Sequence, residues 1–187
     1  MKRVFIHHEG ALGDMLISYP CIRGIRKEYE LIHVAGKQDA VEFLRLTGTI
    51  DEASSSDSLL YTSLHTSTVE IIVEEILSRF DSAFVFTKKG DSVFTENIRA
   101  MIPLTEVIIT VPPKEHTLHV GEFRMRQLFG RIKNNIMTLP LNTPRLHRER
   151  ALEFLAMSGY YGQGRPLIAL HPGSGGEKKC WPLENYF

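Results

Sequence analysis

The chain has 187 residues, 43% of them hydrophobic and 24% charged, which is an ordinary globular composition with enough chain for one good core. Lys and Arg together number 22, as do Asp and Glu, so no global charge attracts nucleic acid. Cys21 and Cys180 lack metal-ligand spacing and favour a reducing compartment over a disulfide framework. No apolar run approaches a membrane span, so we expect a cytoplasmic protein, with peripheral contact at the inner face of the cytoplasmic membrane left open.

The first part of the chain alternates predicted strands and helices. Apolar runs predict strands at residues 3–6, 31–35, 49–53, 83–87 and 107–111. Helical periodicity predicts helices at residues 15–29 with an interruption at Pro20, at 38–46, after a Ser67–Glu70 capping pair, at 91–101 and at 119–132. The third of these helices is expected to bury Val69, Ile72, Val73, Ile76 and Phe80. Such alternation predicts an α/β fold, a Rossmann-like doubly wound parallel sheet.

The second part of the chain begins a new unit. Residues 134–144 have turn residues and no periodicity, and a helix is expected at 148–157. A fresh strand is expected at 167–170, followed by a glycine-rich loop. We therefore expect an N-terminal domain at 1–144, a linker helix and turn at 145–165, and the start of a second Rossmann-like domain at 166–187. A single strand and helix cannot bury their own faces, so the chain is expected to be a fragment.

The turn Gly10-Ala11-Leu12-Gly13-Asp14 lies between the first strand and the first helix. Its two glycines permit a positive-φ turn and a close approach of backbone to ligand. Asp14 is expected at the N-cap, where the helix dipole and the free N–H groups favour a negative charge. Ligands bind at this edge of an open parallel sheet. Asp14 is therefore either a simple helix cap or a functional carboxylate.

The second glycine-rich loop spans residues 171–176. Its backbone N–H groups can point at one anion, and Lys178 and Lys179 add positive charge. Pro182 suits the first turn of a helix, whose N-terminus also attracts phosphate. The glycine spacing fits neither the P-loop nor the dinucleotide-binding pattern. A plain turn with Trp181 in a core is the alternative interpretation.

Together the two loops resemble glycosyltransferase family nine, the heptosyltransferases of lipopolysaccharide core assembly. The resemblance rests on Gly-x-Leu-Gly-Asp at 10–14 with Pro20 six residues beyond Asp14. It rests equally on His-Pro-Gly-Ser at 171–174 followed by Lys-Cys-Trp-Pro at 179–182. His119, ahead of Arg126 and Leu128, is similar to a weaker feature of the same family.

This resemblance implies a two-domain GT-B enzyme that inverts the anomeric carbon without a metal or another cofactor. The N-terminal domain would bind a lipid A–core saccharide acceptor, and the other domain a nucleotide sugar such as ADP-heptose. The resemblance implies that Asp14 is the catalytic base, on an acceptor-side turn with Gly10, Leu12 and Gly13. It also implies nucleotide-phosphate binding by Gly173, Ser174, Gly175 and Lys179.

Three hypotheses stay open: a heptosyl- or hexosyltransferase, a non-catalytic saccharide- or nucleotide-binding remnant of one, and an unrelated nucleotide-binding Rossmann protein. Asp14 together with the Lys179-x-Trp181-Pro182 element favours the first over the third. Because most of a donor domain is missing from these residues, the activity of the chain alone is an open question. Neither the donor sugar, the acceptor nor the oligomeric state follows from the sequence.

Other polar pairs carry weaker signals. The pair His7–His8 lies on a strand, where neighbours point to opposite faces, and His116 with His119 lacks a third ligand, so we expect no metal site. Lys88–Lys89 follows the fourth strand, where a solvated loop is the simpler interpretation and contact with acceptor phosphates the alternative.

Overall fold

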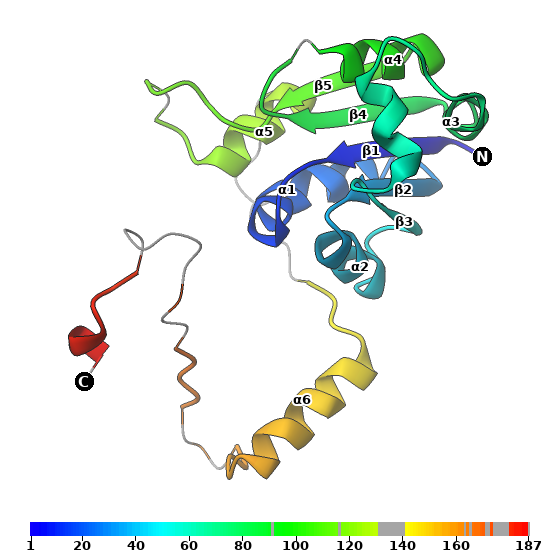
Figure 1. The fold of residues 1–187 in the computed structure, drawn as a ribbon. Coiled ribbons are helices and arrows are strands. Elements are labelled where there is room, and N and C mark those ends of the chain that lie inside the picture. The colour runs from blue at the N-terminus through cyan, green and yellow to red at the C-terminus, as the bar shows by residue number, and fades with distance from the viewer. Residues whose placement is uncertain are drawn as a thin grey trace. The chain divides into compact units, whose positions relative to one another are not determined.

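The structure is a computed structural model that describes residues 1–90, 92–115, 117–130, 141–162, 164, 166–170, 173 and 180–186. The chain divides into two compact units, Met1–Pro144 and Arg145–Phe187, and each is described by itself. In the first unit, a five-stranded parallel sheet carries helices on both faces (Figure 1).

The sheet has the order β3-β2-β1-β4-β5, which confirms the predicted doubly wound α/β fold. Its strands are β1 (Arg3–His8), β2 (Leu31–Gly36), β3 (Glu52–Ser55), β4 (Ser82–Thr87) and β5 (Thr105–Ile109). Its helices are α1 (Leu12–Ile25), α2 (Gln38–Leu46), the 3-10 helix η1 (Leu59–His65), α3 (Ile71–Leu77), α4 (Val93–Met101) and α5 (Val120–Phe129). The chain winds outward in both directions from β1, so the topological switch point lies between β1 and β4.

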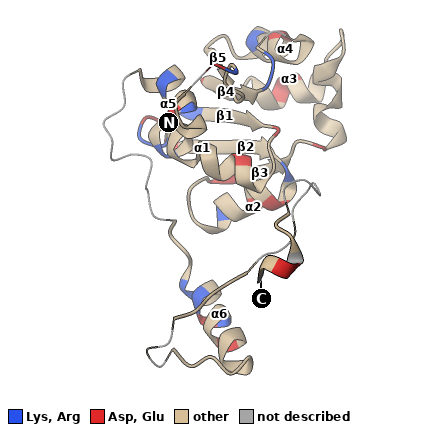
Figure 2. Cartoon of the chain, turned by 90° about the vertical axis from the view of Figure 1, so that its left-hand side faces the viewer, with Lys and Arg blue, Asp and Glu red and all other residues tan. Residues whose placement is uncertain are grey.

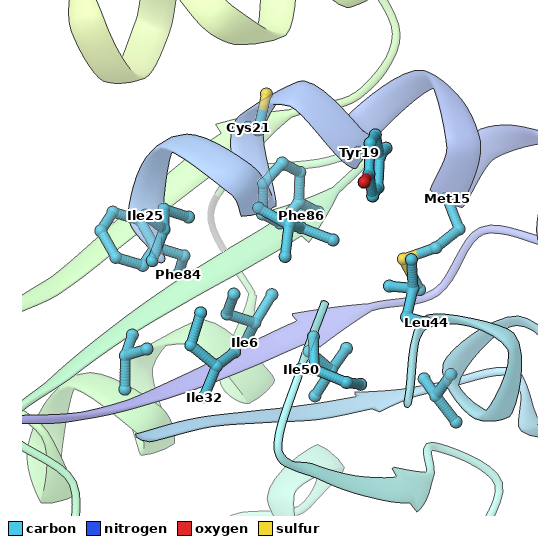
Figure 3. Close-up of a cluster of buried hydrophobic side chains, with 14 of the residues drawn as sticks. Ile6, Met15, Tyr19, Cys21, Ile25, Ile32, Leu44, Ile50, Phe84 and Phe86 are labelled. Carbon is cyan, nitrogen blue, oxygen red and sulfur yellow. The ribbon is translucent and has the colours of Figure 1, made fainter. Parts of the chain in front are cut away.

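Each face of the sheet has its own hydrophobic core. Val4 and Ile6 of β1 belong to the core beneath α1, α2 and α5, part of which is drawn in Figure 3. Phe5 belongs to the core on the other face, beneath η1, α3 and α4. Because β1 is the central strand, its side chains are buried on both faces of the sheet. This is why its sequence reads as one apolar run.

Helix α1 is continuous from Leu12 to Ile25, so the predicted interruption at Pro20 is wrong. A proline inside a helix removes one backbone donor. Here the lost hydrogen bond is outweighed by burial, because Tyr19, Cys21 and Ile22 around Pro20 all lie in the core. Burying one large aliphatic side chain is worth ~1.5–3 kcal/mol, comparable to the cost of the proline.

Two local predictions in the first unit are corrected. Strand β3 begins later than expected, because Thr49 donates its backbone N–H to Leu44 at the end of α2 instead of pairing with β2. Helix α3 begins after Glu70, which makes no side-chain cap, so the Ser67–Glu70 capping pair does not form. Glu70 donates its N–H to the Ser63 hydroxyl of η1, a helix that the sequence did not predict.

The apolar face of α3 also differs from the prediction. Val73 is buried as expected, and so is Phe80 beyond the helix, whereas Ile72 is 48% exposed. Leu77, which was not assigned to the core, is fully buried. Val73 and Leu77, four residues apart, lie on the face of α3 that packs into the core.

In the second unit, the described residues form α6 (Arg145–Met157) and a 3-10 turn, Leu183–Tyr186, that follows Pro182. Residues 166–170 have no secondary structure, so the predicted strand at 167–170 is wrong. A strand is stabilised by hydrogen bonds to a neighbouring strand, and the described part of this unit contains none. Helix α6 carries side chains of both charges (Figure 2), including the pair Arg145–Glu149 at 2.6 Å. Among the helices described here, none is long and apolar enough to cross a membrane.

Candidate active site

A pocket of ≈ 240 Å³ lies at the carboxyl ends of the central strands. Its lining comes from the ends of β1, β4 and β5 and from the start of α1: His8, Glu9, Gly10, Ala11, Asp14, Phe86, Lys88, Thr110 and Val111. His8 and Phe86 are register partners on the neighbouring strands β1 and β4. The pocket is thus at the topological switch point, where open α/β sheets bind their ligands.

The Gly10–Asp14 turn forms one wall of this pocket with a geometry that differs from the prediction. Ala11, with φ −67° and ψ 177°, is the N-cap of α1, and Asp14 belongs to the first helical turn. Neither Gly10 nor Gly13 has a positive φ. Leu12, the first residue of the helix, is 40% exposed. The predicted N-cap role of Asp14 and the positive-φ role of the glycines are therefore both wrong.

Gly10 lies where no larger side chain has room. A Cβ atom at this position would lie 2.4 Å from the Cβ of Asp14 and 2.6 Å from Cε1 of His8, which is closer than real Cβ contacts. At Gly13 a Cβ would meet nothing within 4 Å. The chain thus passes close to Asp14 and His8 at Gly10, whereas Gly13 faces open space.

Asp14 lines the pocket, and its side chain is 54% exposed. It lies in the first turn of α1, where the helix dipole favours an acidic side chain. Its oxygen Oδ1 lies 3.4 Å from Nη2 of Arg124. The carboxylate is therefore accessible to a ligand and is contacted by a cation from behind.

Arg124 of α5 is the buried partner of this site, with a side chain only 2% exposed. It donates to the backbone oxygen of Asp14 at 2.8 Å, to the hydroxyl of Ser18 at 2.7 Å and to the backbone oxygen of Thr110 at 3.0 and 3.2 Å. Burial lowers the pKa of Arg124 from its ordinary value, and Asp14 acts in the opposite direction. One guanidinium thus joins α5, the first turns of α1 and the residue after β5.

Arg124 was not predicted as a site residue. The sequence feature noted on this helix involves Arg126, which is exposed and pairs with Glu122 at 2.6 Å. The useful signal is the two-residue spacing, which puts Arg124 and Arg126 on different sides of α5. That spacing does not say which of the two points inward.

His8 completes the wall of the pocket as a neutral imidazole. The backbone N–H of Gly10 donates to Nδ1 at 3.0 Å, so Nδ1 is an acceptor and the proton is on Nε2. Nε2 therefore donates to the Ser18 hydroxyl at 2.9 Å. Burial, and then the charge of Arg124, lower the pKa of His8 to about 4. His8 also stacks on Phe86, with ring centroids 5.2 Å apart.

Two exposed charged side chains, Glu9 and Lys88, complete the rim. Lys88 is in the position that the sequence assigned either to a solvated loop or to anion contact, and it lines the same pocket as Asp14. It forms no ion pair within the described residues. A cation here can attract an anionic group of a ligand near Asp14.

The residues predicted to bind nucleotide phosphate belong to the second unit. Gly173 is exposed, and Ser174, Gly175 and Lys179 lie outside the described residues. Of the histidines considered for metal binding, His116 also lies outside them, and His119 caps α5 by accepting from Gly121 N–H at 3.1 Å. The described residues contain no group of three or more potential metal ligands.

The fold and the position of the pocket define an α/β protein of the doubly wound class with a pocket at its switch point. No family model matches the chain, and no curated protein matches it. The chain is similar to the crystal structure of the glycosyl transferase family 9 from Veillonella parvula DSM 2008, with a TM-score of 0.70 and 20% identity. The match covers 99% of this chain and 58% of that chain, so our chain spans little more than half of the neighbour's length.

Proposed function

We propose that this chain is the acceptor side of an inverting glycosyltransferase and that Asp14 is its catalytic base. The observation that carries the proposal is the accessible Asp14 carboxylate in the switch-point pocket, braced by the buried Arg124. The likeness in fold to a glycosyl transferase family 9 structure and the two sequence motifs support the same function.

In this proposal, Asp14 accepts the proton of an acceptor hydroxyl while that oxygen attacks the anomeric carbon of the donor. The new glycosidic bond forms as the bond to the nucleoside diphosphate breaks, and the diphosphate leaves with the electron pair. A single displacement inverts the configuration. Lys88 at the rim attracts an anionic group of a bound substrate, and Arg124 keeps Asp14 in place.

The finer parts of the proposal rest on the sequence motifs alone. The turn at 10–14 and the Lys-Cys-Trp-Pro element at 179–182 favour heptose, or a related sugar, as the transferred group, ADP-heptose as the donor and a lipid A–core saccharide as the acceptor. Gly173, Ser174, Gly175 and Lys179 would stabilise the leaving diphosphate. Such an acceptor would bring the enzyme to the inner face of the cytoplasmic membrane.

The stereochemistry of the product tests this mechanism. The natural protein that carries this chain is incubated with ADP-heptose and a core saccharide, and proton NMR follows ADP release and the new anomeric signal. We expect one new glycoside whose configuration is opposite to that of the donor. A product of retained configuration would contradict single displacement with Asp14 as the base. Transfer from UDP- or GDP-sugars alone would contradict the proposal that ADP-heptose is the donor.

A non-catalytic saccharide-binding protein is the second candidate. It is favoured by the fact that the residues of the Asp14 pocket all belong to the first unit, Met1–Pro144. This candidate predicts saccharide binding without release of nucleoside diphosphate from any donor. The same NMR experiment therefore separates the two.

A further inference from the structure

A second polar pocket, of ≈ 220 Å³, lies on the other side of β1. It is formed at the ends of β1, β2 and β3 and by η1, and we call it the His7 pocket: His7, Glu9, Lys37, Ser56, Asp57 and His65. Glu9 lines both this pocket and the Asp14 pocket. The two pockets therefore meet at the carboxyl end of β1.

His7 is a buried histidine, and one of its two ring nitrogens has no hydrogen-bond partner among the described residues. The residue is 2% exposed, and its Nδ1 is the atom concerned, buried and without a hydrogen bond to any part of the chain that the structure describes. The ring packs on Phe94, with centroids 4.3 Å apart. Burial lowers the pKa of His7 to about 3, so the ring is neutral. Because Nδ1 is sealed, Nε2 is the nitrogen that His7 can offer to the pocket.

An unpartnered buried imidazole usually has a reason, since most buried polar side-chain atoms are hydrogen-bonded. A buried N–H without a partner is rarer than a bare acceptor. The proton is therefore assigned to Nε2, which can donate to an oxygen of a ligand. The Nε2–H of His7 is thus a potential donor in the lining of the His7 pocket.

The charges around His7 select against anions. The Lys37 ammonium is held by both carboxylate oxygens of Asp57, at 2.8 and 2.9 Å. Glu9 adds a second carboxylate. With one ammonium, already paired, and two carboxylates in the lining, binding of a phosphate or carboxylate group of a ligand is unfavourable. Hydroxyl groups suit this lining, because each can donate to a carboxylate and accept from Nε2 of His7.

We propose that the His7 pocket binds an uncharged sugar ring of the acceptor, next to the ring whose hydroxyl meets Asp14. This proposal rests on the glycosyltransferase function proposed above. Because Glu9 lies between the two pockets, a ligand of two linked sugar rings can occupy both. The acceptor is then at least a disaccharide, and its ring at His7 carries no phosphate or carboxylate.

The binding test uses the ¹⁵N-labelled 187-residue chain and no donor. The probes are the methyl glycosides of mannose, glucose, galactose and N-acetylglucosamine, with mannose 6-phosphate and glucose 6-phosphate as anionic probes. We expect a neutral glycoside to shift the amide signals of Lys37, Ser56, Asp57 and His65 saturably. Failure of every neutral glycoside, or tighter binding of the phosphates, would overturn the proposal.

Two variants locate the site. His7→Phe keeps a ring against Phe94 and removes both nitrogens, so it should fold and bind at least tenfold more weakly. Glu9→Gln lies on the exposed rim and should weaken binding without a change in fold. Glu28→Gln, the same substitution on an exposed residue beyond the other end of α1, is the control and should bind normally. Equal affinity of all three variants would refute the assignment.

The outcome is independent of the proposed transfer reaction. Glycoside binding at the His7 pocket that persists in Asp14→Asn supports the saccharide site even if no transfer is found. If transfer to a disaccharide acceptor is found and His7→Phe leaves its KM unchanged, the glycosyltransferase proposal stands and the His7 pocket proposal fails.

Discussion

The carboxylate of Asp14 is positioned by two neighbours that act in different ways. Gly10 leaves the space in which the Asp14 side chain and the His8 ring lie close together. Arg124 contacts both the backbone and the carboxylate of Asp14. The rotamer of Asp14 is therefore limited by packing on one side and by hydrogen bonds on the other.

Gly10 and Gly13 form a matched pair for testing this packing. Gly10→Ala must displace Asp14 or His8, so we expect a loss of transfer or ligand affinity of tenfold or more. Gly13→Ala meets open space within a helix and should be neutral or stabilise by up to ~1 kcal/mol. Turnover and thermal unfolding of both variants check this. Equal turnover of the two would show that the space at Gly10 is irrelevant.

The buried histidines predict how stability depends on pH. His7 and His8 have folded-state pKa values of about 3 and about 4, both below the ordinary 6.5. Between the folded and ordinary values, the unfolded chain binds protons that the folded chain does not. The free energy of unfolding should therefore fall as the pH drops below about 6.5, by about 2 kcal/mol for His7 alone at pH 4.5.

Urea unfolding at pH 7 and pH 4.5 measures this effect. His7→Phe should lose less stability between the two pH values than the wild type does, because the variant lacks the contribution of His7. The contributions of the carboxylates are the same in the variant and in the wild type, so they cancel in the comparison. Equal losses would mean that His7 is protonated in the folded protein.

At this scale, the sequence predicted part of the candidate site. Asp14 and Gly10 could be singled out because a glycine-rich turn after a strand is a local pattern. Arg124 and Ser18 could not, since their contacts to Asp14 and His8 depend on how α5 packs against α1. The neutral tautomer of His8 likewise depends on the Gly10 N–H, which only the folded turn aims at Nδ1.

Among the elements, α1, α5 and the end of β5 are joined by one side chain. Arg124 donates to α1 through Asp14 and Ser18, and beyond β5 to the backbone oxygen of Thr110. The helices also touch where Phe129 of α5 covers Gly24, at which a Cβ would lie 2.5 Å from the ring. Helix α5 thus stabilises the wall of the site from behind.

Removal of Arg124 should loosen this wall. Arg124→Met keeps an unbranched side chain but leaves several buried oxygens without donors, so we expect a destabilisation of about 2–4 kcal/mol. Arg126→Met on the same helix removes only an exposed pair with Glu122 and should cost under ~1 kcal/mol. Chemical denaturation compares the two. A cost for Arg124→Met as small as that of Arg126→Met would contradict the bracing role.

Element boundaries show what the sequence pattern can and cannot predict. Helix α2 was predicted with its observed limits, because its apolar spacing and the following Gly48 are local signals. The continuity of α1 across Pro20 depends on burial by the whole sheet. The 3-10 helix η1 forms around Tyr61 and Leu64, which pack into the core beneath α4, and no periodicity marks it.

For the molecule as a whole, the sheet order explains why two pockets lie at one edge. With β1 central, its carboxyl end is flanked by β4 on one side and β2 on the other. His8 and His7 consequently line different pockets, because successive residues of a strand lie on opposite faces of the sheet. The α/β class and the doubly wound parallel sheet followed from the alternation of strands and helices. The strand predicted at 167–170 did not form, because a strand depends on partners that a local pattern cannot supply.

The most direct test of the central claim compares two aspartates in equivalent positions. Asp14 and Asp39 are the acidic residues in the first turns of α1 and α2, and only Asp14 lines the switch-point pocket. The rate of nucleoside diphosphate release in the presence of acceptor is measured for Asp14→Asn and Asp39→Asn in the natural protein. We predict a fall of ~10²–10⁴-fold for Asp14→Asn with thermal stability retained, and wild-type turnover for Asp39→Asn. Wild-type turnover in Asp14→Asn would contradict the assignment of Asp14 as the base.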